Sequence, residues 1–166
     1  MGISLEIERK FLVLSETFKL EATVRVAMRQ GYLSTDPGRV VRVRLSENLD
    51  SGRREAFLTI KGQSIDKGLS RVEWEQAIDF EEAEQLLALC LNYPIEKTRY
   101  FVPVQGHTFE VDVFDGDNKG LIVAELELPA VTAEFTRPEW LGQEVTHDGK
   151  YTNAALNNRP FSTWAD

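Results

Sequence analysis

Hydrophobic and polar residues alternate along most of this chain, which is the period of a half-buried β-strand. Turn residues separate the alternating segments, as at Asp36-Pro37-Gly38 and Asp115-Gly116-Asp117-Asn118. Because the connections are short, neighbouring strands are expected to be antiparallel. The expected strands cover residues 3–13, 27–34, 39–47, 55–62, 69–79, 95–104, 107–114 and 121–128.

One helix is predicted near the middle of the chain. Asp79, with Glu82 three residues later, forms a start that resembles a capping box, and apolar residues follow at helical spacing. The helix is expected to end at Asn92-Tyr93-Pro94, because the residue that precedes a proline disfavours helical backbone. Residues 16–26 are also predicted to be helical, and residues 138–155 to form short helices joined by a turn.

The composition narrows the class of protein. The 166 residues, 42% of them hydrophobic, are enough for one domain with its own core, so residues 1–166 are expected to form a single domain. The 19 Lys and Arg against 27 Asp and Glu give a net charge of −8, which argues against a dedicated nucleic-acid binder. A single cysteine, no recognisable signal peptide and no membrane-spanning run favour a cytoplasmic protein without a membrane partner.

Charged residues gather on one face of the predicted strands, since residues i and i+2 of a strand point to the same side. Acidic pairs and basic pairs lie on different strands, and like charges held this close repel each other. The acidic members of this set are Glu6, Glu8, Glu73, Glu75, Glu110, Asp112, Glu125 and Glu127. The basic members are Lys10, Arg42, Arg44, Lys61, Arg71, Lys97 and Arg99.

Two structures are compatible with this charged face. The first is an ordinary antiparallel sheet with one solvated face. The second is a barrel of about eight strands, whose interior is just wide enough for side chains or one small ligand. Such a barrel needs water, metal ions or a charged ligand inside, because an unpaired buried charge is very costly. Carboxylates suit Mg²⁺ or Mn²⁺, and Arg and Lys suit phosphate, so a polyphosphate bridged by divalent cations satisfies both charge sets.

Several segments match a known family. The first strand carries an ExExK motif, Glu6-Ile7-Glu8-Arg9-Lys10. Further matches in the same order are Gln30-Gly31-Tyr32-Leu33, Arg42-Val43-Arg44, Thr59-Ile60-Lys61, Arg71-Val72-Glu73-Trp74-Glu75, Lys97-Thr98-Arg99, Glu125-Leu126-Glu127, Trp140-Leu141-Gly142 and Lys150-Tyr151-Thr152-Asn153. Taken together, these segments resemble the CYTH superfamily, the triphosphate tunnel metalloenzymes, over nearly the whole chain.

The resemblance implies a mostly β fold with flanking helices (α+β), built on a closed eight-stranded antiparallel barrel. It implies metal-dependent hydrolysis of inorganic triphosphate to pyrophosphate and phosphate, with Lys10 and Tyr32 as a catalytic pair. The residues implied to hold the Mg²⁺ or Mn²⁺, two ions in all, are Glu6, Glu8, Asp112, Glu125 and Glu127. The residues implied to bind phosphate are Arg42, Arg44, Lys61, Lys97, Arg99 and Lys150. The roles of Glu73, Glu75 and Glu110 stay open between metal binding and charge balance.

Three other functions stay open beside the small-molecule triphosphatase. They are a class IV adenylate cyclase, a thiamine triphosphatase and a non-catalytic module that binds polyphosphate or nucleotide. The His-Phe pair upstream of ExExK that is typical of the cyclases is absent, which favours the triphosphatase. The sequence leaves open the preferred triphosphate, the choice between Mg²⁺ and Mn²⁺, and whether the chain forms a homodimer.

Overall fold

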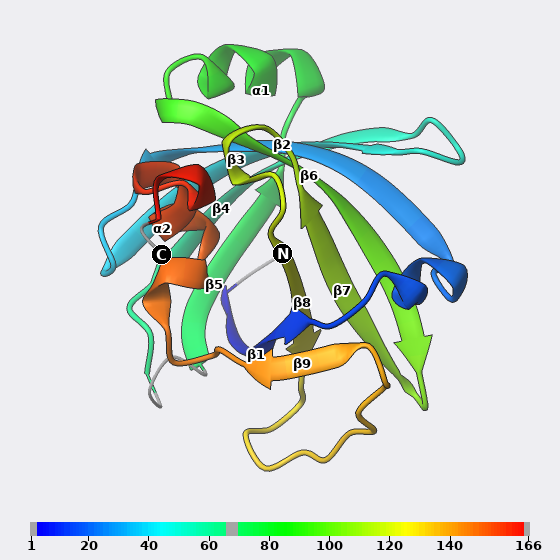
Figure 1. Cartoon of the computed structure of the whole chain (residues 1–166). Helices are drawn as coiled ribbons and strands as arrows, with labels where there is room; N and C mark the ends of the chain where they lie inside the picture. Colours follow the sequence, from blue (N-terminus) through cyan, green and yellow to red (C-terminus); the bar gives the residue numbers. More distant parts are fainter. Residues whose placement is uncertain (1–2, 66–69, 165–166) are drawn as a thin grey trace.

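In the computed structural model, eight antiparallel strands close into a barrel (Figure 1). The structure describes residues 3–65 and 70–164, without the side chains of Ser4 and Glu6. A ninth short strand, β9, adds to the outside of β1. This architecture confirms the predicted fold class. The strands are β1 (Ile3–Val13), β2 (Val24–Ser34), β3 (Arg39–Asn48), β4 (Arg54–Gly62), β5 (Ser70–Ala77), β6 (Leu91–Val104), β7 (His107–Phe114), β8 (Ile122–Glu127) and β9 (Leu141–Glu144).

Strand β1 closes the barrel by pairing with two different strands. The strand order is β5-β4-β3-β2-β6-β7-β8-β1, and β5 also pairs with β1. The first half of β1 pairs with β5, from Ile3 opposite Trp74 to Ile7 opposite Ser70. The second half pairs with β8, from Glu8 to Leu12. The ExExK segment therefore lies at the point where the two edges of the sheet meet.

The helical segments are short and lie outside the barrel. They are α1 (Phe80–Leu87), α2 (Asn153–Asn158) and the 3₁₀ turns η1 (Thr17–Leu20), η3 (Gly116–Asn118), η4 (Gly149–Tyr151) and η5 (Phe161–Thr163). The predicted start of α1 is confirmed, because the Asp79 carboxylate accepts a hydrogen bond from the Glu82 backbone N–H at 3.1 Å. Within the described ranges, no helix has both the length and the apolar character that a membrane crossing requires.

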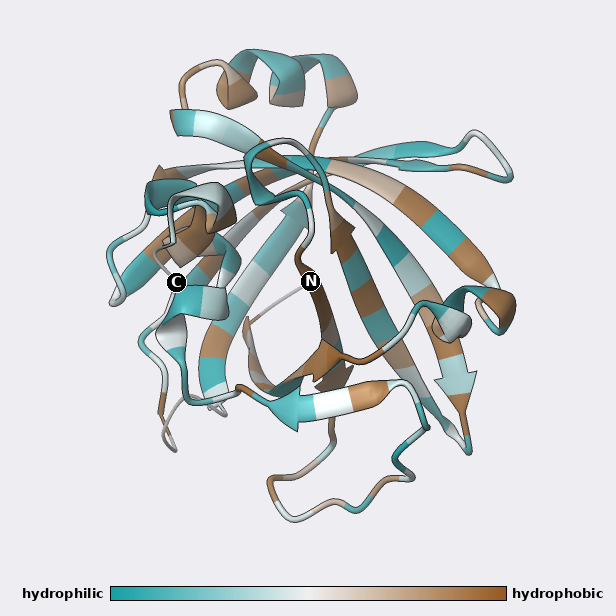
Figure 2. Cartoon of the chain, viewed as in Figure 1, coloured by the Kyte–Doolittle hydropathy of each residue, from teal (hydrophilic) through white to brown (hydrophobic). Residues whose placement is uncertain are grey.

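The hydrophobic packing of this barrel lies on its outer side. Hydrophilic and hydrophobic positions alternate along the strands (Figure 2), and the charged positions line the interior. One apolar cluster includes Phe11, Phe18 and Trp140, and α1 completes another by packing Ala83 and Leu87 on β3 and β4. A third cluster joins Leu156 of α2 to β6 and β8. The flanking segments thus cover the apolar outer surface, which leaves the interior polar.

Three predictions of local structure are wrong. Residues 16–26 form only η1 and the beginning of β2, because the β-branched residues from Val24 onward favour a strand. The predicted helical tail is wrong in part, because it contains η4 and the start of α2 but also β9, which pairs with β1 at Phe11 opposite Glu144. Helix α1 ends at Leu87, well before Pro94. Pro94 lies in β6, at the point where the register of the pairing with β2 shifts.

Candidate active site

The barrel encloses a cavity of about 180 Å³ with a mostly charged lining. It is smaller than the roughly 300–1,000 Å³ of pockets that bury drug-sized ligands. The predicted site residues that line it are Glu8, Lys10, Tyr32, Arg42, Arg44, Lys61, Lys97, Arg99, Glu125 and Glu127. The charged face therefore points into a shared hollow, which excludes the alternative of an open sheet with a solvated face.

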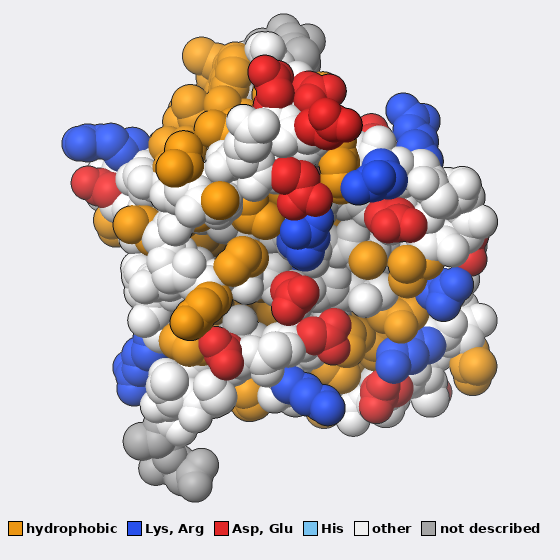
Figure 3. Space-filling model, turned by 90° about the horizontal axis from the view of Figure 1, so that it is seen from above, with side chains coloured by type: hydrophobic (Ala, Val, Ile, Leu, Met, Phe, Trp, Pro, Cys, Tyr) orange, Lys and Arg blue, Asp and Glu red, His pale blue; other side chains and the backbone are white. Residues whose placement is uncertain are grey.

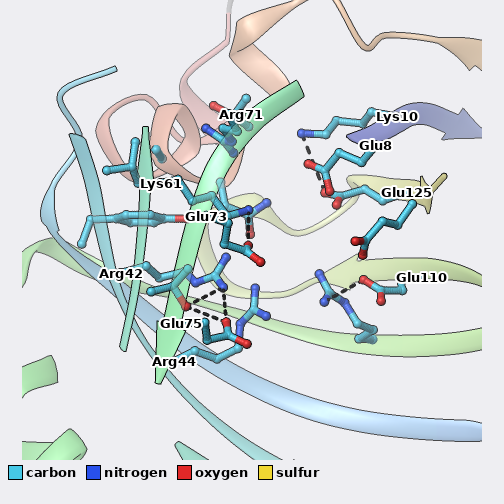
Figure 4. A pocket seen from close by; sticks show the side chains of 18 of the residues that line it. Glu8, Lys10, Arg42, Arg44, Lys61, Arg71, Glu73, Glu75, Glu110 and Glu125 are labelled. Atoms are coloured by element: carbon cyan, nitrogen blue, oxygen red, sulfur yellow. Dashed lines mark hydrogen bonds and ion pairs between the residues drawn. The ribbon is translucent and has the colours of Figure 1, made fainter. Parts of the chain in front are cut away.

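Most acidic and basic side chains of the cavity gather on opposite walls. Figure 4 shows Glu8, Glu110 and Glu125 on one side, with Arg42 and Arg44 on the other. The acidic wall is built by the neighbouring strands β7, β8 and β1, which also carries Lys10, and the basic wall by β3, β4, β5 and β6. The basic wall also holds Glu73 and Glu75 of β5, which pair with its lysine and arginine side chains. A small ligand in the cavity therefore contacts opposite charges on its two sides.

The outer surface does not share this segregation. On the face that carries α1, acidic, basic and apolar side chains are interspersed, and neither sign forms one continuous field (Figure 3). The ion pairs there are exposed, as in Arg29 with Glu84 at 2.8 Å. Segregated charge is thus a feature of the cavity and not of this surface.

On the acidic wall, carboxylates of neighbouring strands lie directly opposite one another. Glu8 pairs in register with Glu127, and Glu110 with Glu125. Like charges at such positions destabilise a sheet. Part of this repulsion is offset by Lys10, whose Nζ lies 3.7 Å from Oε1 of Glu125. Burial alone would raise the pKa of Glu125, but the positive charges of Lys10 and Arg99 hold that pKa well below its usual range, so the carboxylate is ionised.

The chemistry of the acidic wall fits a divalent cation. Ionised carboxylates supply the hard oxygen ligands that Mg²⁺ and Mn²⁺ prefer. Among the side chains that the structure describes, no three acidic, histidine or cysteine groups come close enough to form a complete metal site by themselves. Mg²⁺ is commonly held by one or two carboxylates together with substrate phosphates. Glu8, Glu125 and Glu127 therefore suit a cation whose coordination the substrate completes.

On the basic wall, Arg42 has an unsatisfied donor. Its Nη2 donates to Thr59 Oγ1 at 3.2 Å and lies 3.5 Å from Oε1 of Glu75. The Thr59 hydroxyl donates in turn to Glu75 at 2.7 Å, which fixes the guanidinium in place. Within the described part of the chain, the buried Nε of Arg42 has no acceptor. Because buried polar groups are normally hydrogen-bonded, this N–H is available to an acceptor in the cavity, such as a water molecule or an anion.

Asp112 lies among the basic residues and does not line the cavity. It is 1% exposed and accepts hydrogen bonds from Lys97 Nζ at 2.7 Å and from Arg99 at 2.8 and 3.0 Å. Burial alone would raise the pKa of Asp112, but Arg99 and Lys97 lower it. The structure thus places Asp112 outside the cavity lining, as the counter-charge that holds Lys97 and Arg99.

Burial lowers the pKa of two cations on the same wall. It brings the pKa of Lys97 to about 7, although Asp112 opposes the shift. It brings the pKa of Arg44 to about 9, with the nearby charges of Arg42 and Arg99 adding to the effect. Loss of a proton from either group relieves the repulsion between neighbouring positive charges. An anion bound beside them is expected to raise both pKa values again and so to restore their charge.

Lys150 is not brought together with the other predicted residues, and Lys10 and Tyr32 both line the cavity of the described structure without contacting each other. Lys150 is exposed, and its Nζ lies 4.6 Å from the ring centroid of Trp164, outside the cavity lining. The Tyr32 hydroxyl accepts from Gln30 Nε2 at 3.3 Å, and among the described contacts no hydrogen bond joins it to Lys10. Glu6 lies in β1 opposite Arg71, but its side chain lies outside the described part of the structure.

The cavity also contains residues that the sequence did not single out as site residues. Thr59 and Arg71 line it from β4 and β5, and Thr152 and Asn153 enter from the start of α2. Gln30 lies beneath them, fully buried on β2. Gln30 lies two residues before Tyr32 and so on the same face of β2, which means that the period of the strand could have predicted its place beside the cavity. Asn153 belongs to a segment that matches the family, but no strand period indicates its place, because its position depends on how the C-terminal segment packs on the barrel.

Comparison with known proteins finds relatives that match nearly the whole chain. The chain is 41% identical to an inorganic triphosphatase of Acetivibrio thermocellus over 162 residues, 97% of this chain and 98% of that protein. It is 40% identical to one of Nitrosomonas europaea over 154 residues, 91% of this chain and 95% of that protein. A crystal structure of an inorganic triphosphatase matches 91% of this chain and 96% of its own, with 35% identity and a TM-score of 0.62. The CYTH domain family model matches residues 4–154, and the chain therefore belongs to the CYTH domain family.

Proposed function

We propose that this protein hydrolyses inorganic triphosphate to pyrophosphate and phosphate inside the barrel, with divalent cations on the acidic wall. The observation that carries the proposal is the buried, unpaired Nε of Arg42 beside a small cavity with one basic and one acidic wall. The relatives named inorganic triphosphatase support this choice of substrate.

The basic wall binds and orients the substrate. Arginine forks match pairs of phosphate oxygens, so Arg42 and Arg44 fix the position of the anion while Lys61 adds a point charge. Positioning and charge neutralisation account for most of the catalysis of phosphoryl transfer, and a rigid barrel supplies both. The closed sheet fixes the backbone of the strands that carry these residues.

Glu8, Glu125 and Glu127 are the residues proposed to hold the cations, two Mg²⁺ or Mn²⁺ ions. When bound, a divalent cation neutralises phosphate oxygens and lowers the pKa of the attacking water. Lys10 is proposed as the catalytic lysine, because its ammonium faces the acidic wall beside Glu125. Tyr32 is proposed to orient it, which requires a movement of one of the two side chains from their positions here. We place the reaction in the cytoplasm, in accordance with the single cysteine.

One assay panel tests this function. Tripolyphosphate, thiamine triphosphate and ATP are each incubated with Mg²⁺ or Mn²⁺, and phosphate, pyrophosphate and cyclic AMP are measured. We expect phosphate and pyrophosphate in equal amounts from tripolyphosphate, at a rate far above that of phosphate release from ATP. Cyclic AMP and pyrophosphate as the main products would identify an adenylate cyclase instead. Binding without any product would identify a non-catalytic module.

Lys10→Ala tests the catalytic lysine. The variant is expected to lose turnover and to retain the wild-type circular dichroism spectrum, because the rest of the charged lining stays in place. Lys19→Ala is a matched control, since Lys19 is an exposed lysine of η1 outside the barrel. Wild-type activity in the Lys10 variant would remove this residue from the mechanism.

A further inference from the structure

The start of α2 closes part of the cavity with residues whose hydrogen-bonding groups are mostly in use. Thr152, Asn153 and Ala154 all line the cavity. The Thr152 hydroxyl donates to the Gly149 carbonyl at 2.9 Å and accepts from the Ala155 N–H at 3.2 Å. Ala154 has no polar side chain. Asn153 is therefore the member of this segment whose side chain can make a polar contact with a ligand.

A chain of donors and acceptors fixes which way the Asn153 amide points. Arginine has no acceptor, so the hydrogen bond at 2.7 Å between Arg44 Nε and Gln30 must use the Gln30 carbonyl oxygen. The Gln30 Nε2 group is then a donor, and it faces Oδ1 of Asn153 at 2.7 Å. Lys97 Nζ, also a donor without an acceptor, lies 2.8 Å from the same oxygen. Two donors thus occupy Oδ1.

The other half of the amide is left with its donors available. The structure gives Nδ2 of Asn153 no acceptor among the described residues, although the side chain borders the cavity. We infer that Nδ2 of Asn153 donates a hydrogen bond to a phosphate oxygen of the bound triphosphate, with Gln30 as the residue that positions it. This inference rests on the proposed function. It assigns to Asn153 the contact from the C-terminal segment that the family resemblance had implied for Lys150.

The competing explanation is that Asn153 only fastens α2 to the barrel through Oδ1. Asn153→Asp separates the two explanations, because a carboxylate keeps both acceptor contacts with Gln30 and Lys97 but replaces the N–H groups with an oxygen. If Asn153 only fastens α2, this variant keeps its affinity apart from the effect of one added negative charge. If Nδ2 contacts phosphate, the variant places a carboxylate oxygen against an anion.

Asn158→Asp is the matched control. Asn158 is an exposed residue at the other end of α2 and does not line the cavity. The substitution adds the same charge to the same helix, so it measures the long-range electrostatic effect alone. The Asn158 side-chain amide donates to the Thr35 hydroxyl at 3.0 Å. Asn158→Asp therefore also removes one hydrogen bond from an amide N–H, as Asn153→Asp is proposed to do in the complex.

The experiment compares the wild type with both variants. We measure KM and kcat with tripolyphosphate, its Kd without divalent cations by calorimetry in EDTA, and the melting temperature without ligand. We expect KM and Kd of Asn153→Asp to be at least about tenfold above those of Asn158→Asp, the low end for a hydrogen bond to a charged group. The melting temperature is expected to stay near that of the wild type, because the contacts of Oδ1 are kept.

The outcomes separate the two proposals. Equal KM and Kd for the two variants, with an active wild type, would overturn the role of Asn153 and leave the proposed function standing. A rise in KM for Asn153→Asp with a matching fall in melting temperature and an unchanged Kd would also overturn it. A wild type that neither binds nor hydrolyses tripolyphosphate would overturn the proposed function, and the role of Asn153 with it.

Discussion

Asp112→Asn tests whether this carboxylate anchors the basic wall. Asp112 is 1% exposed and accepts three hydrogen bonds from Lys97 and Arg99. The substitution keeps the shape of the side chain but leaves the buried Lys97 without its counter-charge and Arg99 with only Glu110, 3.0 Å away. Removing one partner of a buried ion pair costs about 3–5 kcal/mol. Because the free energy of unfolding of a typical protein is about 5–15 kcal/mol, a loss of this size is easily measured.

Glu84→Gln provides the control for this measurement. Glu84 forms a 2.8 Å ion pair with Arg29, but both side chains are 42% exposed. Exposed ion pairs contribute about 0–1 kcal/mol, so this variant is expected to unfold nearly as the wild type does. The two variants each remove one carboxylate charge, so their difference isolates the effect of burial.

The assay is urea unfolding followed by circular dichroism at neutral pH, with and without tripolyphosphate. Without ligand, Asp112→Asn is expected to lose about 3–5 kcal/mol. With tripolyphosphate, part of this loss is expected to be recovered, since the anion supplies negative charge beside Lys97 and Arg99. A loss below about 1 kcal/mol, like that of the control, would refute the reasoning. A large rise in the Mg²⁺ concentration needed for half-maximal rate would instead support Asp112 as a metal ligand.

Three further predictions concern the cavity and the packing around it. Arg42→Ala is expected to raise the Kd for tripolyphosphate at least about tenfold by calorimetry, whereas Lys150→Ala leaves it nearly unchanged; equal effects would contradict the placement of the two side chains. Because burial lowers the pKa of Lys97 to about 7, this lysine is expected to take up a proton when triphosphate binds at pH 8. The calorimetric heat of binding should then differ between buffers of different ionisation enthalpy. Identical heats would argue against this proton uptake. Gly31→Ala is expected to lower the free energy of unfolding, measured in urea, by about 1–3 kcal/mol, because the new Cβ would lie 2.8 Å from Cβ of Cys90. Gly149→Ala is the control, since its new Cβ meets nothing within 4 Å. Equal stabilities of the two variants would show that the contact at Gly31 relaxes without cost.

The barrel and most of its charged lining could be predicted because a strand has a period of two. That period assigns Glu8, Arg42 and Glu125 to the inner face without any knowledge of the partner strands. It does not give the depth of a side chain or its neighbours. Glu110 and Asp112 share one face of β7, yet Glu110 lines the cavity and Asp112 lies buried between Lys97 and Arg99.

The segments outside the barrel were harder to predict, because packing and not local preference decides their structure. The short strand β9 forms only because its backbone can pair with the free part of β1. Asn153 reaches the cavity only because Leu156 and its neighbours pack α2 against the barrel. Lys150, three residues earlier, lies instead over the rings of Tyr151 and Trp164. Its charge suggested a phosphate ligand, but the chain direction at η4 carries it outside.

The most direct test of a triphosphate bound between two charged walls is anomalous X-ray diffraction at the manganese edge. Crystals would be grown with Mn²⁺ and an imido analogue of tripolyphosphate that resists hydrolysis. We predict a manganese peak beside Glu8 or Glu125, with phosphate oxygens contacting Arg42 and Arg44 across the cavity. An analogue bound on the outer surface, or a barrel interior without manganese, would contradict the account.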